Sequence, residues 1–138
     1  MVKRPRVVLA DDNEPIRENV NRLLTSDFEV VATVSDGLAA FDAVAALQPD
    51  AVILDISMPP TNGFEIAKQI SALTHPPRII FLSVHEGDEF LAAARKAGAS
   101  GYVFKRNAST DLIRVLNETL SGRTTFPELD DEATPAGD

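Results

Sequence analysis

The chain alternates between short apolar runs and longer segments with helical spacing. The runs are rich in Val, Ile and Phe and nearly continuous, as in parallel strands covered on both faces. They predict five strands, at residues 6–10, 28–34, 51–55, 79–84 and 101–104. The segments between them repeat apolar residues three or four positions apart, which is typical of helices with one buried face. They predict five helices, at residues 14–24, 37–47, 63–73, 86–97 and 109–121.

Residues that favour helix ends flank these segments. Asp12 or Asn13 can cap the first helix, and Pro15 falls in its first turn. Asp36 can cap the second helix by the same mechanism. Gly122 follows the last helix and is expected to stop it, because glycine readily adopts the left-handed conformation found there.

Five strand–helix repeats with right-handed crossovers predict a doubly wound α/β fold. For a chain of 138 residues, the best match is a (βα)5 flavodoxin-like sandwich with a five-stranded parallel sheet of order 2-1-3-4-5. We therefore expect one domain over residues 1–122. Residues 123–138 contain two prolines and five acidic residues, and we expect an acidic flexible tail there.

Charge and composition narrow the classes of function. The net charge is −8, and 16 acidic and 13 basic residues remain outside the last eleven positions. No basic stripe is present, so we expect no direct contact with nucleic acid. The absence of cysteine excludes disulfides and thiolate metal sites. No apolar run approaches the ~20 residues of a membrane span, and the expected location is cytoplasmic.

Acidic residues follow two strands that lie side by side in this strand order. Asp11 and Asp12 follow the first strand, and Asp55 follows the third. Such acids can be helix caps, and that alternative stays open for Asp12; it suits Asp55 poorly, because the next predicted helix begins only at residue 63. Carboxylates about 4 Å apart repel by about 4 kcal/mol at an effective dielectric of 20. A bound cation relieves this repulsion, and oxygen ligands of this kind favour Mg²⁺.

Two further strand ends point to the same edge of the sheet. Ser83 closes the fourth strand and Lys105 follows the fifth. Either residue alone is commonly a cap or a solvated side chain, whereas their occurrence together with three aspartates favours a site. Three carboxylates, one Mg²⁺ and one ammonium have a summed charge of zero. Such a site is suited to binding a phosphoryl group.

These residues fall into five short motifs, at Val8-Leu9-Ala10-Asp11-Asp12, Leu54-Asp55-Ile56-Ser57-Met58-Pro59 with Asn62-Gly63, Ser83, Ala97-Gly98-Ala99 and Gly101-Tyr102-Val103-Phe104-Lys105. Their order and spacing resemble the receiver (response-regulator) domain of two-component signalling, from residue 6 to about residue 121. The final motif and helix most resemble receivers that precede helix-turn-helix output domains. The chain ends about 17 residues after that helix, so we expect a stand-alone receiver or one cut from a longer regulator.

The resemblance implies a role for each site residue. Asp55 would accept the phosphoryl group, with Mg²⁺ held directly by Asp12, largely through water by Asp11, and by the Ser57 carbonyl. Ser83 and Lys105 would bind the phosphoryl oxygens. Tyr102 would change rotamer on activation, and we expect its ring to be partly exposed in the unphosphorylated chain.

The resemblance also implies partners. The donor would be a sensor histidine kinase, a phosphotransfer protein or a small acyl phosphate. The chain would assist its own phosphorylation and dephosphorylation without being an enzyme. A homodimer is possible, and no membrane partner is expected. Ser57 and His85 would border the site and tune the lifetime of the phosphoryl group, although His85 can equally be a plain surface residue; His75 has no assigned role.

The sequence departs from the family pattern at two positions. Arg106 follows the lysine where the family often has proline, so a cis bond between Lys105 and Arg106 would cost about 2.5–4 kcal/mol. Thr61-Asn62-Gly63 stands where Met-Asp-Gly is common, and asparagine still suits that turn.

Three other functions compete with this interpretation. A Mg²⁺-dependent phosphohydrolase of the haloacid-dehalogenase type would need a second aspartate where Ser57 stands. A flavodoxin-like flavin carrier would need hydroxyls and glycines after the first strand, where Asp11, Asp12 and Glu14 repel phosphate. An unphosphorylated docking module would not need the full set of acids.

Overall fold

The computed structural model describes residues 3–127. Its main sheet has five parallel strands in the order β2-β1-β3-β6-β7. They are β1 (Arg6–Ala10), β2 (Glu29–Val34), β3 (Ala51–Leu54), β6 (Arg78–Ser83) and β7 (Gly101–Phe104). This order corresponds to 2-1-3-4-5 of the five main strands, and it confirms the predicted fold class.

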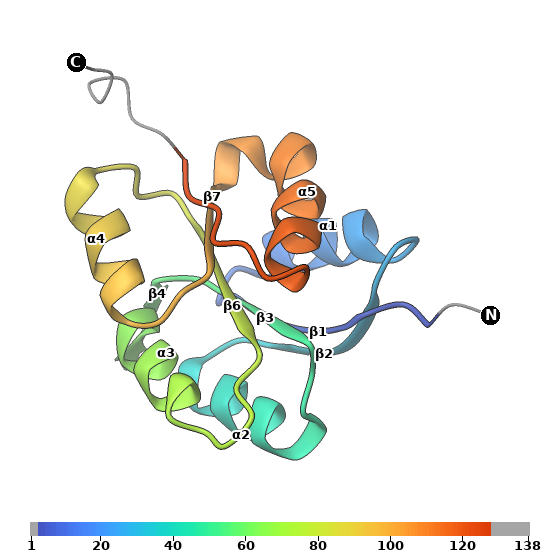
Figure 1. Cartoon of the computed structure of the whole chain (residues 1–138), viewed down its shortest axis with the longest axis horizontal. Helices are drawn as coiled ribbons and strands as arrows, with labels where there is room; N and C mark the ends of the chain where they lie inside the picture. Colours follow the sequence, from blue (N-terminus) through green and yellow to red (C-terminus); the bar gives the residue numbers. More distant parts are fainter. Residues whose placement is uncertain (1–2, 128–138) are drawn as a thin grey trace.

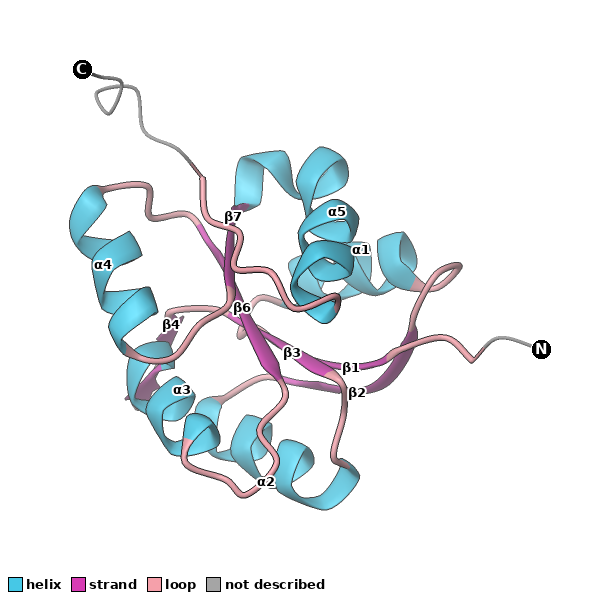
Figure 2. Ribbon diagram, in the orientation of Figure 1, coloured by secondary structure: helices cyan, strands magenta, loops and turns pink. Residues whose placement is uncertain are grey.

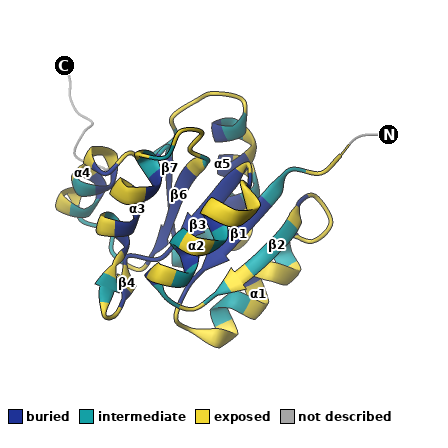
Figure 3. Cartoon of the chain, turned by 90° about the horizontal axis from the view of Figure 1, so that it is seen from below, coloured by how far each residue is buried: buried dark blue, intermediate teal, exposed yellow. Residues whose placement is uncertain are grey.

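The five predicted helices are present, and they cover both faces of the sheet (Figures 1 and 2). They are α1 (Glu14–Leu24), α2 (Gly37–Leu47), α3 (Gly63–Ser71), α4 (Asp88–Lys96) and α5 (Ala108–Leu120). Residues of α1 and α5 pack in one hydrophobic cluster, and residues of α2, α3 and α4 pack in the other. The strands between these clusters are mostly buried (Figure 3). Burial on both faces explains their nearly continuous apolar sequence.

Side-chain caps explain where two of the helices begin. Asn13, not Asp12, caps α1: its side chain accepts a hydrogen bond from the N–H of Ile16 at 3.0 Å. Asp36 caps α2 as predicted, because its carboxylate accepts from the N–H of Ala39 at 2.8 Å. Asp12 is therefore left without a capping role, and its side chain is exposed.

Two short elements were absent from the sequence-based prediction. A hairpin of β4 (Ser57–Met58) and β5 (Thr61–Asn62) lies between β3 and α3, with a cis peptide bond at Pro59–Pro60. A 3₁₀ turn, η1 (Lys105–Asn107), connects β7 to α5. Within residues 3–127 the Pro59–Pro60 bond is the one cis bond, so the bond between Lys105 and Arg106 is trans.

The first residues of the predicted tail contact the domain. Thr125 pairs in parallel with Gly101 of β7, and Phe126 packs against the core cluster of α2, α3 and α4. In Figure 1 this red segment runs from α5 back along β7. Residues 128–138, which hold the rest of the predicted tail, lie outside the described residues. Among residues 3–127, no helix has the length and apolar character required to cross a bilayer.

Candidate functional site

Three carboxylates meet at the carboxyl ends of two neighbouring strands. Asp11 directly follows β1 and Asp55 directly follows β3, and the N–H of Asp55 donates to the carbonyl of Ala10 at 3.1 Å. One carboxylate oxygen each from Asp11, Asp12 and Asp55 lies within 4.8 Å of the others. Asp11 and Asp55 are 1% and 5% exposed, whereas Asp12 faces solvent. The strand order thus brings together the acids that the sequence placed at these two strand ends.

Lys105 provides the positive charge nearest to the buried carboxylates. Its Nζ lies 2.8 Å from Asp11 Oδ2 and 3.4 Å from Asp55 Oδ2. Asp11 Oδ1 accepts a hydrogen bond from the N–H of Asn13 at 2.9 Å. Asp11 Oδ2 is fully buried, and apart from this ion pair it has no hydrogen bond of good geometry with residues 3–127. Lys105 thus pairs with two of the three carboxylates of the cluster, and its single charge leaves an excess of negative charge there.

Two effects raise the pKa of the Asp55 carboxyl and three lower it. Burial raises the pKa of the Asp55 carboxyl, and the neighbouring carboxylate of Asp11 raises it further. The charge and hydrogen bond of Lys105 lower this pKa, as does the backbone N–H of Ser57. The net shift is upward, because removing the carboxylate from water outweighs one ammonium shared with Asp11.

The donor set fits a hard cation. Carboxylate and carbonyl oxygens are the ligands that Mg²⁺ and Ca²⁺ prefer. Within the described part of the chain, the buried oxygen of Asp11 has Lys105 as its one partner. A divalent ion would neutralise the excess negative charge of the cluster. The residues present can therefore hold such an ion.

Gly63 supports the backbone that carries Asp55. Its N–H donates to the carbonyl of Ile56 at 2.7 Å, and its neighbour Asn62 caps α3 by accepting from the N–H of Glu65. A Cβ at Gly63 would overlap the carbonyl oxygen of Asp55 and lie 2.9 Å from the Cα of Ile56. Both are backbone atoms, so a side chain here must displace the segment that follows β3.

We therefore expect Gly63→Ala to lower the free energy of unfolding by about 1.5 kcal/mol, as overpacking does in a buried site. Gly87→Ala is the matched control, because a Cβ there meets only the end of the flexible Glu89 side chain. Urea unfolding of both variants measures the difference. Equal stability of the two variants would show that the Gly63 contact does not constrain the site.

Ser83 ends β6 and is completely buried. Its Oγ accepts a hydrogen bond from the N–H of His85 at 3.0 Å. The carbonyl of His85 in turn accepts from the hydroxyl of Tyr102 at 2.8 Å. Ser83 and Tyr102 are therefore connected through one backbone residue, on the side of the site formed by β6 and β7.

The expected partial exposure of Tyr102 is wrong: the residue is 1% exposed. Its ring lies between those of Phe81, Phe104 and Phe126, at centroid distances of 6.2, 5.9 and 6.1 Å. Burial raises the pKa of its hydroxyl, although contact with Ser83 lowers it. Phe126 was assigned to the flexible tail, so the sequence analysis missed the ring that covers Tyr102.

The loop after β6 is held by two further contacts. Arg106 donates from Nε and Nη2 to the two carboxylate oxygens of Glu86, at 2.6 and 2.8 Å. These hydrogen bonds lower the pKa of Glu86. The His85 ring stacks on Phe90 with 4.2 Å between centroids. Arg106, which stands where the resemblance leads one to expect proline, thus connects the two loops beside the site.

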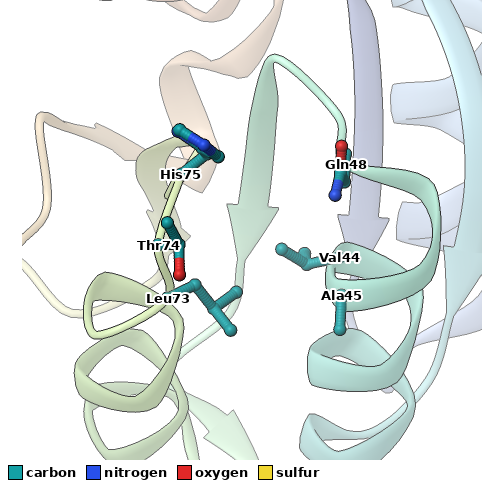
Figure 4. A pocket seen from close by; sticks show the side chains of 6 residues that line it. All are labelled: Val44, Ala45, Gln48, Leu73, Thr74 and His75. Atoms are coloured by element: carbon teal, nitrogen blue, oxygen red, sulfur yellow. The ribbon is translucent and has the colours of Figure 1, made fainter.

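A pocket of about 170 Å³ lies between the ends of α2 and α3 (Figure 4). Its lining includes His75, Gln48 and Leu73, and none of the site residues discussed above. It opens near the starts of β3 and β6, at the opposite edge of the sheet from the carboxylates. This pocket is therefore separate from the candidate site.

Comparisons with known proteins extend over most of the chain. Residues 7–117 match the family model described as the response regulator receiver domain. The chain is 34% identical over 122 residues to the oxygen regulatory protein NreC of Staphylococcus epidermidis, covering 86% of this chain and 56% of NreC. It is 33% identical over 119 residues to the transcriptional regulatory protein DegU of Brevibacillus brevis, covering 85% and 50%. The chain thus spans about half the length of these relatives.

A solved structure shows the same arrangement of elements. It is a two-component response regulator of the LuxR family from Aurantimonas sp. SI85-9A1, with a TM-score of 0.84 and 31% sequence identity. The match covers 89% of each chain.

Proposed function

The chain belongs to the response regulator receiver domain family, and we propose that it is a signalling switch phosphorylated on Asp55. The donor is the phosphohistidine of a sensor histidine kinase or of a phosphotransfer protein. One observation carries the proposal: Asp55 directly follows a buried strand and lies 3.4 Å from the Lys105 ammonium, beside the carboxylates of Asp11 and Asp12. This arrangement combines a nucleophilic carboxylate with a cation able to stabilise phosphoryl oxygens.

The proposed reaction is a displacement at phosphorus. A carboxylate oxygen of Asp55 forms the new O–P bond as the P–N bond to the donor imidazole breaks, and the imidazole retains the electron pair. Lys105 faces the charge that spreads over the phosphoryl oxygens. Ser83 already accepts from the N–H of His85, so its own proton is available to donate to a phosphoryl oxygen. Water later cleaves the acyl phosphate and restores the carboxylate.

We propose that Asp11, Asp12, Asp55 and the main-chain carbonyl of Ser57 hold Mg²⁺. When bound, this ion supplies positive charge to the carboxylates and to the phosphoryl oxygens. The buried Asp11 Oδ2, whose one partner among the residues described is Lys105, supports the assignment. Asp11 is oriented by the N–H of Asn13, and its backbone carbonyl accepts from Arg17 at 2.7 Å, so the cluster is held in place by its own surroundings.

The relatives suggest what the switch controls. NreC and DegU are named as regulatory proteins, and we propose that phosphorylation of this chain serves a transcriptional output in the cytoplasm. Residues 1–127 hold 16 acidic and 13 basic residues without a basic stripe, so we expect no direct contact of these residues with DNA.

Intact mass after incubation with acetyl phosphate tests the proposed function. We expect one added phosphoryl group with Mg²⁺, and none in excess EDTA or in Asp55→Asn. Asp12→Asn is compared as a metal-ligand variant and should be labelled more slowly. Equal labelling of Asp55→Asn and the unmodified chain would exclude Asp55 as the acceptor.

A further inference from the structure

We propose that residues 123–127, called the strap from here on, dock on the outer edge of β7 and hold Tyr102 in its buried position. We further propose that docking of the strap and phosphorylation favour the same conformation of Tyr102. The first statement depends only on the contacts of the strap; the second rests on the proposed function. Together they assign the edge of β7 as an intramolecular binding surface for an extended segment that carries an aromatic side chain.

The end of α5 directs the chain toward this edge. Gly122 has a φ of +104°, in the left-handed region that favours glycine. The N–H groups of Gly122 and Arg123 donate to the carbonyls of Thr119 and Glu118, at 3.0 Å each. This pattern is a Schellman motif, which ends a helix and reverses the chain. The strap therefore leaves α5 in a defined direction.

The strap then forms one residue of a sixth parallel strand. Thr125 pairs with Gly101, donating its N–H to the carbonyl of Ser100 at 2.8 Å and accepting from the N–H of Tyr102 at 3.2 Å. Its hydroxyl donates to Glu118 at 3.0 Å. Because β7 is an edge strand, its outer backbone groups would otherwise be open to another chain. A partner that pairs with this edge would have to displace the strap.

Phe126 connects the strap to Tyr102. The two rings are 6.1 Å apart between centroids, inclined by 32°, and the guanidinium of Arg95 on α4 lies 4.0 Å above the Phe126 ring. Phe126 thus lies between a cation and an aromatic ring, and both contacts favour an ordered position. On its other side, Tyr102 reaches the carbonyl of His85. Contacts therefore run without a gap from the strap through Tyr102 to His85, whose N–H donates to Ser83 Oγ.

Two sites can thus act on the conformation of Tyr102: the strap, through Phe126, and the phosphorylation site, through Ser83 and His85. The strap contacts Tyr102 when its ring is buried, and a ring turned out to solvent would lose the contact with Phe126. If the Ser83–phosphoryl bond also favours the buried ring, each event strengthens the other, because linkage between two sites is reciprocal. The strap would then explain why Tyr102 is buried in this structure.

The sequence offers a direct readout, because Tyr102 is the one tyrosine and the chain has no tryptophan. We propose to measure acrylamide quenching of Tyr102 fluorescence in the full chain, in EDTA. Phe126→Ala removes the aromatic contact, and Thr125→Pro removes the N–H that bonds to Ser100. Each should raise the quenching constant at least about twofold, since the outward population of Tyr102 grows. Thr124→Ala, at an exposed position, is the matched control and should not change it.

Beryllofluoride with Mg²⁺ tests the second statement. It should lower the quenching constant of Phe126→Ala to that of the unmodified chain. The quenching constant of the unmodified chain itself should change little. By reciprocity, Phe126→Ala should bind beryllofluoride about threefold more weakly. Acetyl phosphate labelling of the same samples shows independently whether Asp55 is the acceptor.

The outcomes separate the claims. Unchanged quenching in both strap variants, or strong quenching of the unmodified chain, would overturn docking of the strap on Tyr102. A raised quenching constant that beryllofluoride leaves unaltered, in a variant that acetyl phosphate labels at Asp55, would overturn the coupling. Failure of every sample to accept a phosphoryl group would refute the proposed function, while the EDTA comparison would still decide whether the strap docks.

Discussion

Lys105→Met should destabilise the metal-free chain by about 3 kcal/mol at neutral pH, since losing one partner of a buried ion pair leaves uncompensated charge. The ammonium lies 2.8 Å from Asp11 and 3.4 Å from Asp55, and the two carboxylate side chains are only 1% and 7% exposed. Methionine keeps most of the length of the side chain, so the change tests charge more than volume. Urea unfolding in EDTA measures the effect.

Lys68→Met is the matched control, because Lys68 lies exposed on α3; it should change stability within about 0.5 kcal/mol, as surface substitutions usually do. Adding Mg²⁺ should recover part of the loss in Lys105→Met, because a cation in the cluster replaces the missing charge. Acidification should also reduce the loss, since protonated carboxyls no longer repel. An equal response of the two variants would contradict the charge balance described for the site.

Asp55→Asn should stabilise the metal-free chain by about 2 kcal/mol at neutral pH. Burial and the charge of Asp11 raise the pKa of Asp55, so the folded chain holds this proton more tightly than the unfolded chain. The stability contributed by the protonated carboxyl is present in full when the pH lies below 3.8, the ordinary pKa of an aspartate. It is lost as the pH rises through the raised pKa of the folded chain. Asparagine imitates the protonated form, and its advantage is therefore largest above that raised pKa. Burial of the carboxylate is the larger cause of this effect, and repulsion by Asp11 adds to it, while Lys105 offsets part of both.

The stability difference between Asp55→Asn and the unmodified chain should vanish as the pH falls below about 4. Comparing the two curves removes the contribution of groups far from position 55, so the difference reports on Asp55 and the charges that it contacts. Asp12→Asn, a change at an exposed neighbour, should stabilise much less. A loss of stability in Asp55→Asn at neutral pH would show that burial and repulsion by Asp11 do not make the ionised Asp55 carboxylate unfavourable.

Much of the fold was predictable because its strands and helices have clear patterns of apolar residues along the sequence. β1, β3, β6 and β7 are covered by helices on both faces, which requires apolar residues at nearly every position. The strand order then places Asp11 and Asp55 at one edge of the sheet. The resemblance to the receiver family is confirmed by the match over residues 7–117.

The hairpin of β4 and β5 was not predictable by periodicity. Each strand has two residues, too few to show alternation, and Pro59 and Pro60 suggested only a loop. Met58 was the available signal: it is fully buried, and an apolar residue directly before two prolines can mark such an anchor.

The strap was missed for a related reason. Composition over residues 123–138 is dominated by acids, prolines and threonines, and this average hides one aromatic residue. Phe126 packs on Tyr102 and beneath Arg95, neither of which is near it in sequence. A lone aromatic within a polar segment was the signal, and its partner could be found only in three dimensions.

Chemical mapping of the phosphorylated residue tests the central claim most directly. Borohydride reduces an aspartyl phosphate to homoserine, and peptide mass spectrometry then locates the converted residue in the full chain. After acetyl phosphate and Mg²⁺, we predict homoserine at position 55 alone, with none in EDTA. Homoserine at position 11 or 12, or no conversion in a chain that has gained a phosphoryl group, would contradict the assignment of Asp55 as the phosphoacceptor.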